Sequence, residues 1–432
     1  MPGMLIENHP VTPPSAARTH DPRSARPVLA ASTDALPPIP DTDAEAALTQ
    51  AVLTAIANGQ RLRIAGGDSK HFYGEPPEPS QALLDMRGHS GILSYEPSEL
   101  VITARTGTPL AALEALLAQH GQCLPFEPPH FGASPSNATV GGMVASGLSG
   151  PARASAGAVR DYVLGCKIIN GRGEVLTFGG QVMKNVAGYD VSRLMVGALG
   201  TLGVLLEVSL KVLPVLPGEA TLRFACSQKD ALQWLNTWGG QPLPLNASCW
   251  LVEPVQTDGL GNNANSLTTT ATGTLYLRLR GAIAAVEAAC TSLIKSHSGQ
   301  RLENTPAIAA DWHALRDQHL PWFAERRTDQ DLWRLSVPQT TPVLDLPEPP
   351  LVEWHGGQRW VRAAAGAGPA LRKTAAAAGG HATLFIAARA GDSGPVARFD
   401  ALKPPLDRIH RQLKAEFDPA GIFNQGRLYP EF

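Results

Sequence analysis

The sequence predicts an α+β protein with more than one domain, and three observations carry that prediction. A chain of 432 residues is too long for one simple hydrophobic core. Charged residues make up only 17%, whereas glycine (42) and proline (37) are plentiful, which favours a loop-rich enzyme over a helical bundle. In the second half of the chain, short strand-like segments alternate with helical patterns, as expected for an antiparallel sheet covered on one face.

Composition and charge exclude several classes of function. The formal net charge is −2 without a sustained basic run, so nucleic acid is not an expected partner. No apolar run reaches the length of a membrane span. The cysteines show no C-x-x-C spacing, which favours reduced thiols in the cytoplasm and argues against an iron–sulfur cluster or structural zinc on this chain. They are Cys123, Cys166, Cys226, Cys249 and Cys290.

Order is expected to begin near residue 41. Residues 1–40 hold nine prolines and few aromatic or β-branched residues, which predicts a disordered arm. The first helix is expected to start with a capping box of Thr42 and Glu45 and to end at Asn58-Gly59. A second helix should open at Thr108-Pro109.

The pattern of the chain changes after Pro214 and Pro217, where strand-like segments begin to alternate with helical ones. The chain ends with a predicted helix that carries apolar residues on one face, followed by a short tail. We therefore expect ordered units over residues 41–216, 217–400 and 401–432. The second unit should contain strands at Thr221 to Cys226, Ser248 to Glu253, Thr274 to Arg280, Leu332 to Val337, Gln358 to Arg362 and Thr383 to Ala387.

Two glycine-rich segments are candidate ligand sites. Gly66-Gly67 follows a short strand, so a diphosphate could approach the backbone amides, with Ser69 and Lys70 adding a hydroxyl and a positive charge. A tight turn between strands has the same composition. Thr139 to Gly147 offers free amides to an anion, but a tightly packed helix crossing explains its small residues equally well.

The central segment predicts strands rather than a Rossmann unit. Val159 to Gly165 and Cys166 to Asn170 are expected to form a strand pair, with a turn into a further strand at Val175 to Phe178. Glycines three residues apart occur in Leu194 to Leu213, but they precede a strand and lack the G-x-G that joins a strand to a helix.

Together these segments resemble one known family. The matching residues are Gly66 to Lys70, Phe131-Gly132, Ala138-Thr139, Gly141-Gly142-Met143, Gly150-Pro151, Val159-Arg160-Asp161, Leu164-Gly165, Met183 to Met195, Leu202-Gly203-Val204, Leu332 to Arg334, Gln358 to Trp360, Phe417-Asp418-Pro419 and Phe423-Asn424. The succession is similar to flavoproteins of the vanillyl-alcohol oxidase type, with a PCMH-type FAD-binding domain, and within them to the FAD-binding subunits of bacterial glycolate oxidases. The resemblance covers roughly residues 42–432, and Met183 to Met195 is its specific part.

The resemblance implies a two-subdomain FAD-binding domain at 41–216, a smaller antiparallel-sheet cap at 217–400 and a C-terminal segment returning to the FAD domain. It implies FAD held without a covalent bond, so His71 is expected to be an unattached loop residue. The pyrophosphate cradle would be Ala65, Gly66, Gly67, Asp68, Ser69 and Lys70. Thr139, Gly141, Gly142, Ser146, Gly147, Gly157 and Asp161 would wrap the other side, and Gly200, Gly203 and Val204 would pass under the isoalloxazine ring.

The catalytic residues are less defined. Members of the family that oxidise 2-hydroxy acids carry an H-x-x-D-G-N-x-H segment that binds a metal, and this chain has none, so no metal is expected. Hydride transfer to flavin needs a base for the hydroxyl proton and a cation for the carboxylate. Residues that could supply them, although such residues more often lie at surfaces or in salt bridges, are Arg316, Arg334, Arg359, His381 and Lys184.

Three functions follow from the resemblance. In the first, the chain is the FAD-binding subunit of a glycolate, or 2-hydroxyacid, oxidase complex, acting with a paralogous FAD subunit and an iron–sulfur subunit that passes electrons towards quinone. It would be cytoplasmic and would reach the inner face of the cell membrane only through its partners. In the second, it is a self-sufficient FAD-dependent D-2-hydroxyacid dehydrogenase. In the third, it is a non-enzymatic scaffold.

Overall fold

The computed structural model describes residues 39–431 apart from 133–136, 181–188, 254–271 and 389–395. The expected arm therefore lies almost wholly outside the described residues, as does Lys184. The N-terminal part contains a parallel pair of strands, β1 (Leu62–Ala65) and β2 (Ala82–Asp85). It also contains an antiparallel five-stranded sheet, whose strands are, in spatial order, β3 (Ile92–Glu96), β4 (Val101–Arg105), β8 (Val204–Lys211), β6 (Val163–Ile169) and β7 (Val175–Gly179).

Both faces of the five-stranded sheet are buried, because its strands alternate apolar side chains between two cores. On one face, Leu206 packs in a core with helix α1 (Glu45–Asn58) and the parallel pair. On the other, Leu205 packs in a core with α2 (Leu110–Gln119) and α3 (Val140–Ser146). The expected second helix is thus confirmed, beginning just after Pro109.

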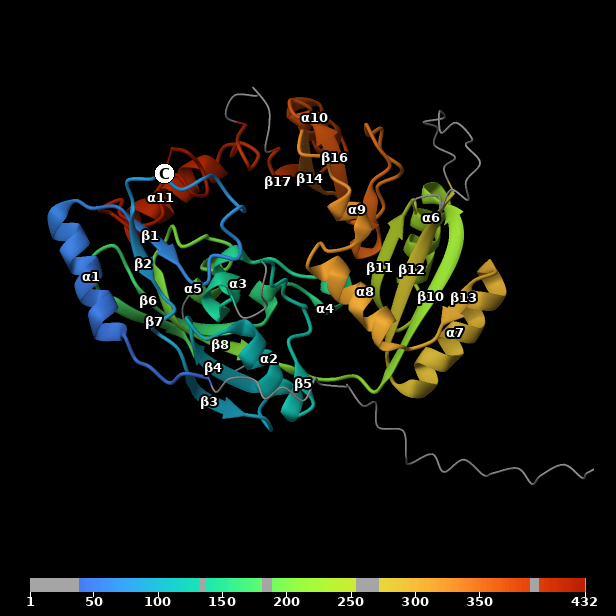
Figure 1. The fold of residues 1–432 in the computed structure, drawn as a ribbon, viewed down its shortest axis with the longest axis horizontal. Helices are drawn as coiled ribbons and strands as arrows, with labels where there is room; N and C mark the ends of the chain where they lie inside the picture. The colour runs from blue at the N-terminus through green and yellow to red at the C-terminus, as the bar shows by residue number, and fades with distance from the viewer. Residues whose placement is uncertain (1–38, 133–136, 181–188, 254–271, 389–395, 432) are drawn as a thin grey trace, which may run out of the picture. The chain divides into compact units, whose positions relative to one another are not determined.

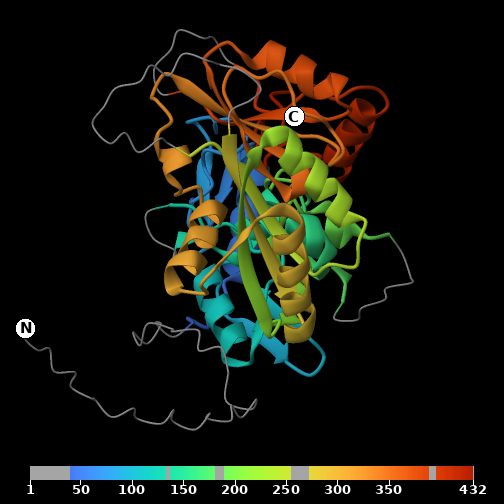
Figure 2. The same cartoon turned by 90° about the vertical axis from the view of Figure 1, so that its right-hand side faces the viewer.

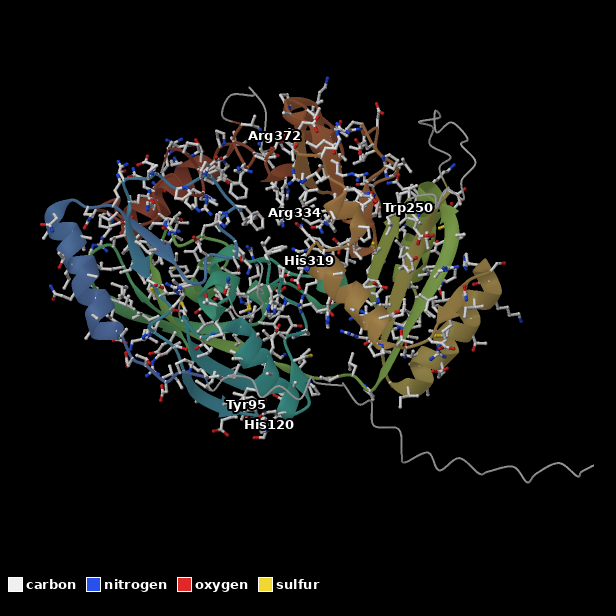
Figure 3. All side chains as sticks on the ribbon, viewed as in Figure 1. Tyr95, His120, Trp250, His319, Arg334 and Arg372 are labelled. Carbon is white, nitrogen blue, oxygen red and sulfur yellow. The ribbon has the colours of Figure 1, made fainter. Side chains whose placement is uncertain are left out.

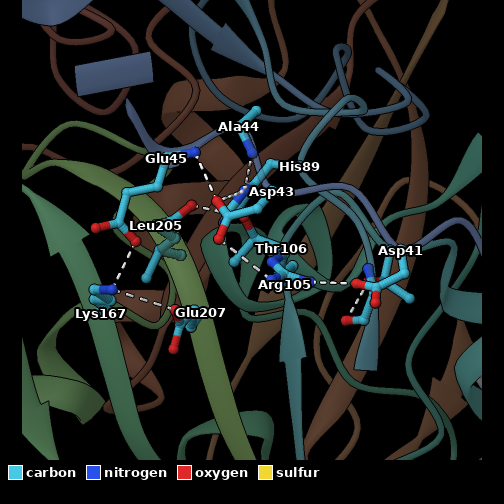
Figure 4. Close-up of polar contacts among 12 residues, drawn as sticks. Asp41, Asp43, Ala44, Glu45, His89, Arg105, Thr106, Lys167, Leu205 and Glu207 are labelled. Atoms are coloured by element: carbon cyan, nitrogen blue, oxygen red, sulfur yellow. Dashed lines mark hydrogen bonds and ion pairs between the residues drawn. The ribbon is translucent and has the colours of Figure 1, made fainter. Parts of the chain in front are cut away.

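The capping box expected at Thr42 and Glu45 is wrong. The backbone of Thr42 instead pairs with that of Ser90, and the Asp43 carboxylate accepts a hydrogen bond from the Glu45 backbone N–H at 2.9 Å. The Glu45 side chain lies 2.6 Å from Lys167 Nζ, which joins the start of α1 to the five-stranded sheet (Figure 4). Thr42 is held by strand-like pairing, so its hydroxyl does not cap the helix.

The expected pair of strands over residues 159–170 is also wrong. Residues Val159–Asp161 form a single 3₁₀ turn, in which the Asp161 carboxylate accepts from the Ala158 backbone N–H at 2.8 Å. One strand, β6, follows, and it turns back after Asn170 into β7 as expected. The local side chain-to-backbone bond closes the chain where apolar alternation alone suggested extension.

The C-terminal part is an eight-stranded sheet in which every paired strand is antiparallel. All six expected strands are present, and two short ones were not foreseen. In spatial order the strands are β13 (Gln300–Leu302), β10 (Gly218–Ser227), β12 (Thr272–Gly281), β11 (Leu245–Leu251), β15 (Leu351–Glu353), β16 (Gln358–Ala364), β14 (Gln330–Ser336) and β17 (His381–Ile386).

The sheet is covered on two faces rather than one. One face packs against α6 (Gln228–Gly239), α7 (Ile283–His297) and α10 (Gly368–Ala377), of which α6 and α7 lie in front of the strands in Figure 2. The other face shares a core with α8 (Pro306–Arg316), α9 (Pro321–Ala324) and side chains of the N-terminal part, among them Phe131. This second face therefore meets the glycine-rich loops.

A buried ion cluster joins the two parts. The Glu127 carboxylate accepts from Arg278 Nη2 at 2.6 Å and from Arg280 Nη1 at 2.8 Å, both on β12, and from the Ala152 backbone N–H at 3.1 Å. The Arg278 side chain is only 2% exposed. Although burial by itself would raise the pKa of Glu127, the two guanidinium groups outweigh it and hold that pKa at about 2.

The C-terminal helix α11 (Leu406–Phe417) and the tail contact the N-terminal part (Figure 1). Lys414 Nζ, which is buried, donates to the backbone oxygens of Thr201 at 2.8 Å and Phe423 at 2.9 Å and pairs with Asp418 at 2.6 Å. The backbone of Phe423 pairs with that of Leu62 in β1. The domain boundaries themselves stay a prediction.

Replacing Glu127 with Gln should lower the free energy of unfolding by ~3–5 kcal/mol, because a buried guanidinium would lose its carboxylate partner. The matched control is Glu287→Gln, whose partner Arg301 sits in an exposed pair and for which ~1 kcal/mol or less is expected. Urea unfolding of both variants measures the difference, and equal losses would contradict the role of the cluster.

The same variant predicts a pH dependence. The Glu127 pKa lies below its ordinary 4.5, so its stabilisation is complete above that pH and is lost as the pH falls towards about 2. Thermal unfolding followed between pH 5 and 2.5 should therefore show a smaller drop in Glu127→Gln than in the wild type. Parallel curves would contradict the assignment.

Candidate functional site

A groove runs through the N-terminal part beside the glycine-rich loops. Its two connected sections enclose about 650 and 420 Å³ of empty space, open solvent included. Both sections are lined by the end of β1 and by α3, so the loop after β1 forms one wall and the start of α3 the other. Expected cofactor residues that line the groove are Ala65, Gly66, Gly67, Asp68, Ser69, Lys70, Thr139, Gly141, Gly142, Ser146, Gly200 and Gly203.

The two glycines after β1 are required by close backbone approach. A Cβ at Gly67 would overlap the carbonyl oxygen of Asn137, and one at Gly66 would overlap the Thr139 hydroxyl. Thr139 also caps α3 by accepting from the Gly142 backbone N–H at 3.1 Å. The loop is therefore packed against the start of α3, and its residues line the groove.

The tight helix crossing considered for the second segment is present as well. A Cβ at Gly141 would lie 2.7 Å from Thr106 Cβ, in the turn after β4. Gly141 also lines the groove. Small residues in α3 thus allow close packing and also line the groove. A packed helix crossing and a ligand site at the start of α3 therefore do not exclude each other.

Lys70 supplies one of the positive charges of the groove. Its Nζ donates to the His130 backbone oxygen at 3.2 Å and to Ser69 Oγ at 3.3 Å. Burial lowers the pKa of Lys70 to about 8, so the ammonium stays mostly protonated at neutral pH. An anionic ligand beside it would favour the charged form further.

The C-terminal tail provides two groove residues that sequence reasoning did not assign. Asn424 accepts from the Ile64 backbone N–H and donates to the Leu199 backbone oxygen, both at 2.7 Å. Arg427 donates to the backbone oxygens of His71, at 2.7 Å, and Glu75. Asn424 belonged to the matched ending of the chain, but no local pattern indicated that this ending meets β1.

Four expected cofactor residues do not line the groove. Gly147 ends α3 and packs against Gly197, while Val204 is fully buried. Gly157 and Asp161 form the turn before β6, where a Cβ on the glycine would lie 3.0 Å from the carboxylate. Their roles in binding stay predictions.

A second cavity lies between the segment after α3 and the eight-stranded sheet, and we call it the Arg334 cavity. It encloses about 320 Å³ of empty space, open solvent included. Its walls are Pro129, Phe131, Leu148, Ser149, Gly150, Pro151, Leu315, Arg316, Gln318, Arg334, Glu353, Gln358, Trp360 and Phe385. Ser146 lines the groove and Leu148 lines the cavity, so the two spaces flank one short segment.

Two of the predicted catalytic arginines share this cavity. Arg334 lies on β14 (Figure 3). Its Nη2 donates to the Tyr73 hydroxyl at 3.2 Å, and its guanidinium carbon is 5.6 Å from the centre of the Phe385 ring. Arg316 at the end of α8 is paired with Asp317 at 2.7 Å. Arg334 is therefore the less neutralised cation.

The structure does not bring the other two candidates to this cavity. Arg359 points away from it, fully buried, and donates to the backbone oxygens of Thr341, at 3.1 Å, and Gly356. His381 is exposed at the start of β17. Within the described part of the chain, no group of three or more His, Cys, Asp or Glu side chains is arranged to hold a metal ion.

Sequence reasoning missed a buried carboxyl in the Arg334 cavity. Glu353, at the end of β15, is 4% exposed. Its Oε2 accepts from Trp360 Nε1 at 2.5 Å and from Gln358 Nε2 at 3.0 Å. Burial raises the pKa of Glu353 to about 7, against these two hydrogen bonds, which act to lower it. The matched run Gln358 to Trp360 was the only nearby signal.

Comparison with known proteins places the chain. Residues 42–179 match the FAD binding domain family model. The chain is 44% identical over 391 residues to glycolate oxidase subunit GlcE of Escherichia coli, covering 90% of this chain and 99% of that one. The chain belongs to the GlcE family. The resemblance inferred from the sequence is thereby confirmed.

Similarity outside the GlcE family is partial. Glycolate oxidase subunit GlcD of Bacillus subtilis is 30% identical over 176 residues, which are 41% of this chain and 35% of that one. A solved structure of alkyldihydroxyacetonephosphate synthase matches with a TM-score of 0.58 at 16% identity, covering 89% of this chain and 74% of that one. The α+β class, with a PCMH-type FAD-binding domain and an antiparallel cap, is confirmed.

The groove fits FAD, the cofactor of this family model. The loop after β1 reaches its place in the groove wall only because its two glycines leave no Cβ to collide with Asn137 and Thr139, and glycine-rich backbone of this kind suits a diphosphate. Among the described residues, no helix is both long and apolar enough to cross a membrane.

Changing Gly67 to Val should abolish flavin retention, because the new side chain collides with Asn137 in the groove wall. Far-UV circular dichroism should stay near that of the wild type, since only a loop moves. The control is Gly88→Ala, where an added Cβ meets nothing within 4 Å. Flavin absorbance of the purified variants measures the effect, and a Gly67→Val chain that remains fully yellow would contradict the groove assignment.

Proposed function

We propose that this chain is the FAD-binding subunit of a complex that oxidises glycolate to glyoxylate. The supporting observation is the 44% identity to GlcE over nearly the full length of that protein. The groove agrees with this function because its glycine-lined loop, Lys70 and Arg427 suit a diphosphate. Bound FAD would supply the two-electron acceptor for the oxidation.

The FAD is proposed to be held without a covalent bond. His71 lies in the groove wall, where its Nδ1 is 3.1 Å from the Asp68 backbone oxygen. Lys70 and Arg427 would pair with the phosphates, and Asn424 would keep the tail against β1. Retention then rests on hydrogen bonds and charge, so unfolding should release the cofactor.

Two partner subunits are proposed, one for a second flavin and one for an iron–sulfur cluster. A paralogous FAD subunit is supported by the partial match to GlcD. An iron–sulfur subunit is proposed because clusters need grouped cysteines, whereas the five cysteines here lie at least 23 positions apart. The complex would work in the cytoplasm or at the inner face of the cell membrane.

A second candidate function is a self-sufficient D-2-hydroxyacid dehydrogenase. The observation favouring it is that Arg316 and Arg334 share one cavity beside the FAD groove. A carboxylate substrate needs such a cation. The two functions differ in whether this chain carries out the oxidation together with partner subunits or alone.

Acid precipitation of the purified yellow chain should leave a colourless pellet and release all flavin into the supernatant. This follows because no bond to His71 is proposed. A spectrum of each fraction measures the distribution. A yellow pellet would contradict non-covalent binding, and a chain that purifies without flavin even under added FAD would favour the scaffold function.

A tagged chain purified from its host should carry a second flavoprotein and a protein with an iron–sulfur absorption spectrum. The control is the Gly88→Ala chain, which leaves every described contact unchanged and should recover the same set. Mass spectrometry and visible spectra identify the partners. Recovery of the chain alone, together with anaerobic bleaching of its flavin by glycolate, would favour the self-sufficient dehydrogenase.

A further inference from the structure

The Arg334 cavity has unused hydrogen-bonding groups of two kinds. On one side, Arg334 spends a single N–H on Tyr73, and its Nε and Nη1 have no hydrogen-bond partner among the described residues. On the other side, the buried Gln358 Oε1 is unpaired, and both described hydrogen bonds to Glu353 fall on Oε2, leaving Oε1 without one. A buried acceptor without a partner, such as Gln358 Oε1, is unusual, and because the donors of the half-buried Arg334 line the same cavity, the arrangement indicates a ligand.

Strand register sets how far apart these groups are. Arg334 pairs with Trp360, and Gln358, two residues from Trp360 on the same face, pairs with Glu353. Arg334 and Glu353 are thus two strands apart and two residues out of step, about 12 Å between their backbones. Two long side chains that converge from that separation leave room for a ligand of only a few heavy atoms.

A small 2-hydroxy acid has the complementary groups. Its carboxylate accepts hydrogen bonds and carries the charge that Arg334 matches, and its hydroxyl donates one hydrogen bond. We propose that the Arg334 cavity binds a small 2-hydroxycarboxylate, with Arg334 pairing with the carboxylate and Glu353 accepting the hydroxyl proton. This proposal rests on the proposed function in one respect, the bound flavin. What it adds is a substrate site on this chain.

Glu353 and a flavin together account for the proton and the hydride that the substrate loses on oxidation. The O–H bond of the substrate breaks and its proton passes to the Glu353 carboxylate, while the carbinol carbon loses a hydride and becomes a carbonyl. FAD, which the adjoining groove would hold, would accept the two electrons as the hydride that the carbinol carbon loses. Glu353 then returns its proton to solvent before the next turnover.

A strained turn positions Glu353. The three residues that follow it, Trp354, His355 and Gly356, all have positive φ, at 54°, 53° and 98°. Trp354 Nε1 donates to the Gly150 backbone oxygen at 3.0 Å, so the turn fixes the cavity wall as well. Non-glycine residues hold such φ values only when their surroundings impose them.

Glu353 is expected to change its charge near neutral pH, because its pKa is raised to about 7. Arg334 and Arg316 line the same cavity, the latter paired with Asp317, and Glu127, whose pKa is held at about 2, acts to raise the pKa of Glu353. Cys249, its neighbour on β11, has its thiol pKa raised well above the ordinary value by burial. Below about pH 7 the Glu353 carboxyl is protonated and cannot accept the hydroxyl proton.

The first test is binding of oxalate, a two-carbon acid that cannot be oxidised at a hydroxyl. Calorimetric titration of the purified chain, with and without FAD, should show at least a tenfold weaker affinity in Arg334→Gln. The matched control is Arg372→Gln on α10, which faces the other side of the sheet (Figure 3) and should bind as the wild type does. Equal affinities in Arg334→Gln and the wild type would overturn the site.

The second test concerns the proton. Infrared difference spectra should show a carboxylic acid band that disappears between pH 6 and 8 in the wild type and is missing in Glu353→Gln. Glycolate should reduce the flavin of the wild-type chain anaerobically, with a rate that rises through about pH 7. Glu353→Gln should keep oxalate binding but lose ~10²–10⁴-fold in this rate. Glu348→Gln is the carboxyl control, because Glu348 pairs with Arg362 at 3.3 Å and does not line the Arg334 cavity, and it should change none of these readouts.

These outcomes separate this inference from the proposed function. A chain that keeps FAD and its partners but shows no band, or whose flavin is reduced only through the partner subunit, overturns the substrate site and leaves the FAD-binding function standing. A chain without flavin that still binds oxalate through Arg334 supports the site and overturns the FAD-binding function.

Discussion

The largely buried carboxylate of Glu127, 16% exposed, constrains the rest of the molecule. Two guanidinium groups from β12 and one backbone N–H donate to it. Leaving the carboxylate or a guanidinium group unpaired away from water would cost a large amount of free energy. The cluster therefore fixes the segment after Phe126 against the eight-stranded sheet. Gly150 and Pro151, which line the Arg334 cavity, lie on the stretch of chain that this cluster holds in place.

A second constraint acts on the other side of the same stretch. The loop after β1 approaches Asn137 and Thr139 so closely that only glycine fits, and Asn424 ties that loop region to the C-terminal tail. Together the two constraints act on residues 146–150, which line the groove proposed for FAD at one end and the Arg334 cavity at the other. A groove that suits a cofactor, next to a polar cavity, is an arrangement that the proposed oxidoreductase function would use.

The polar groups of the Arg334 cavity come from elements distant in sequence. β14 supplies Arg334, β15 supplies Glu353 and β16 supplies Gln358, and the antiparallel order of the sheet brings these strands side by side. The same sheet buries Arg359, next to Gln358 in the chain, on its opposite face. Alternation of side chains in a strand thus decides which of two neighbouring residues reaches the cavity.

The sequence alone determined the α+β class, the six main cap strands and the glycine-rich loops that line the groove, because apolar periodicity and glycine spacing act locally. Local patterns failed where longer-range bonds decided the outcome, as when pairing with Ser90 kept Thr42 from capping α1. The groove contribution of Arg427 and the cavity that Arg334 shares with the missed Glu353 depended on contacts between residues far apart in the chain. Only the tertiary structure decides such contacts, since burial and charge partners are properties of packing rather than of sequence spacing.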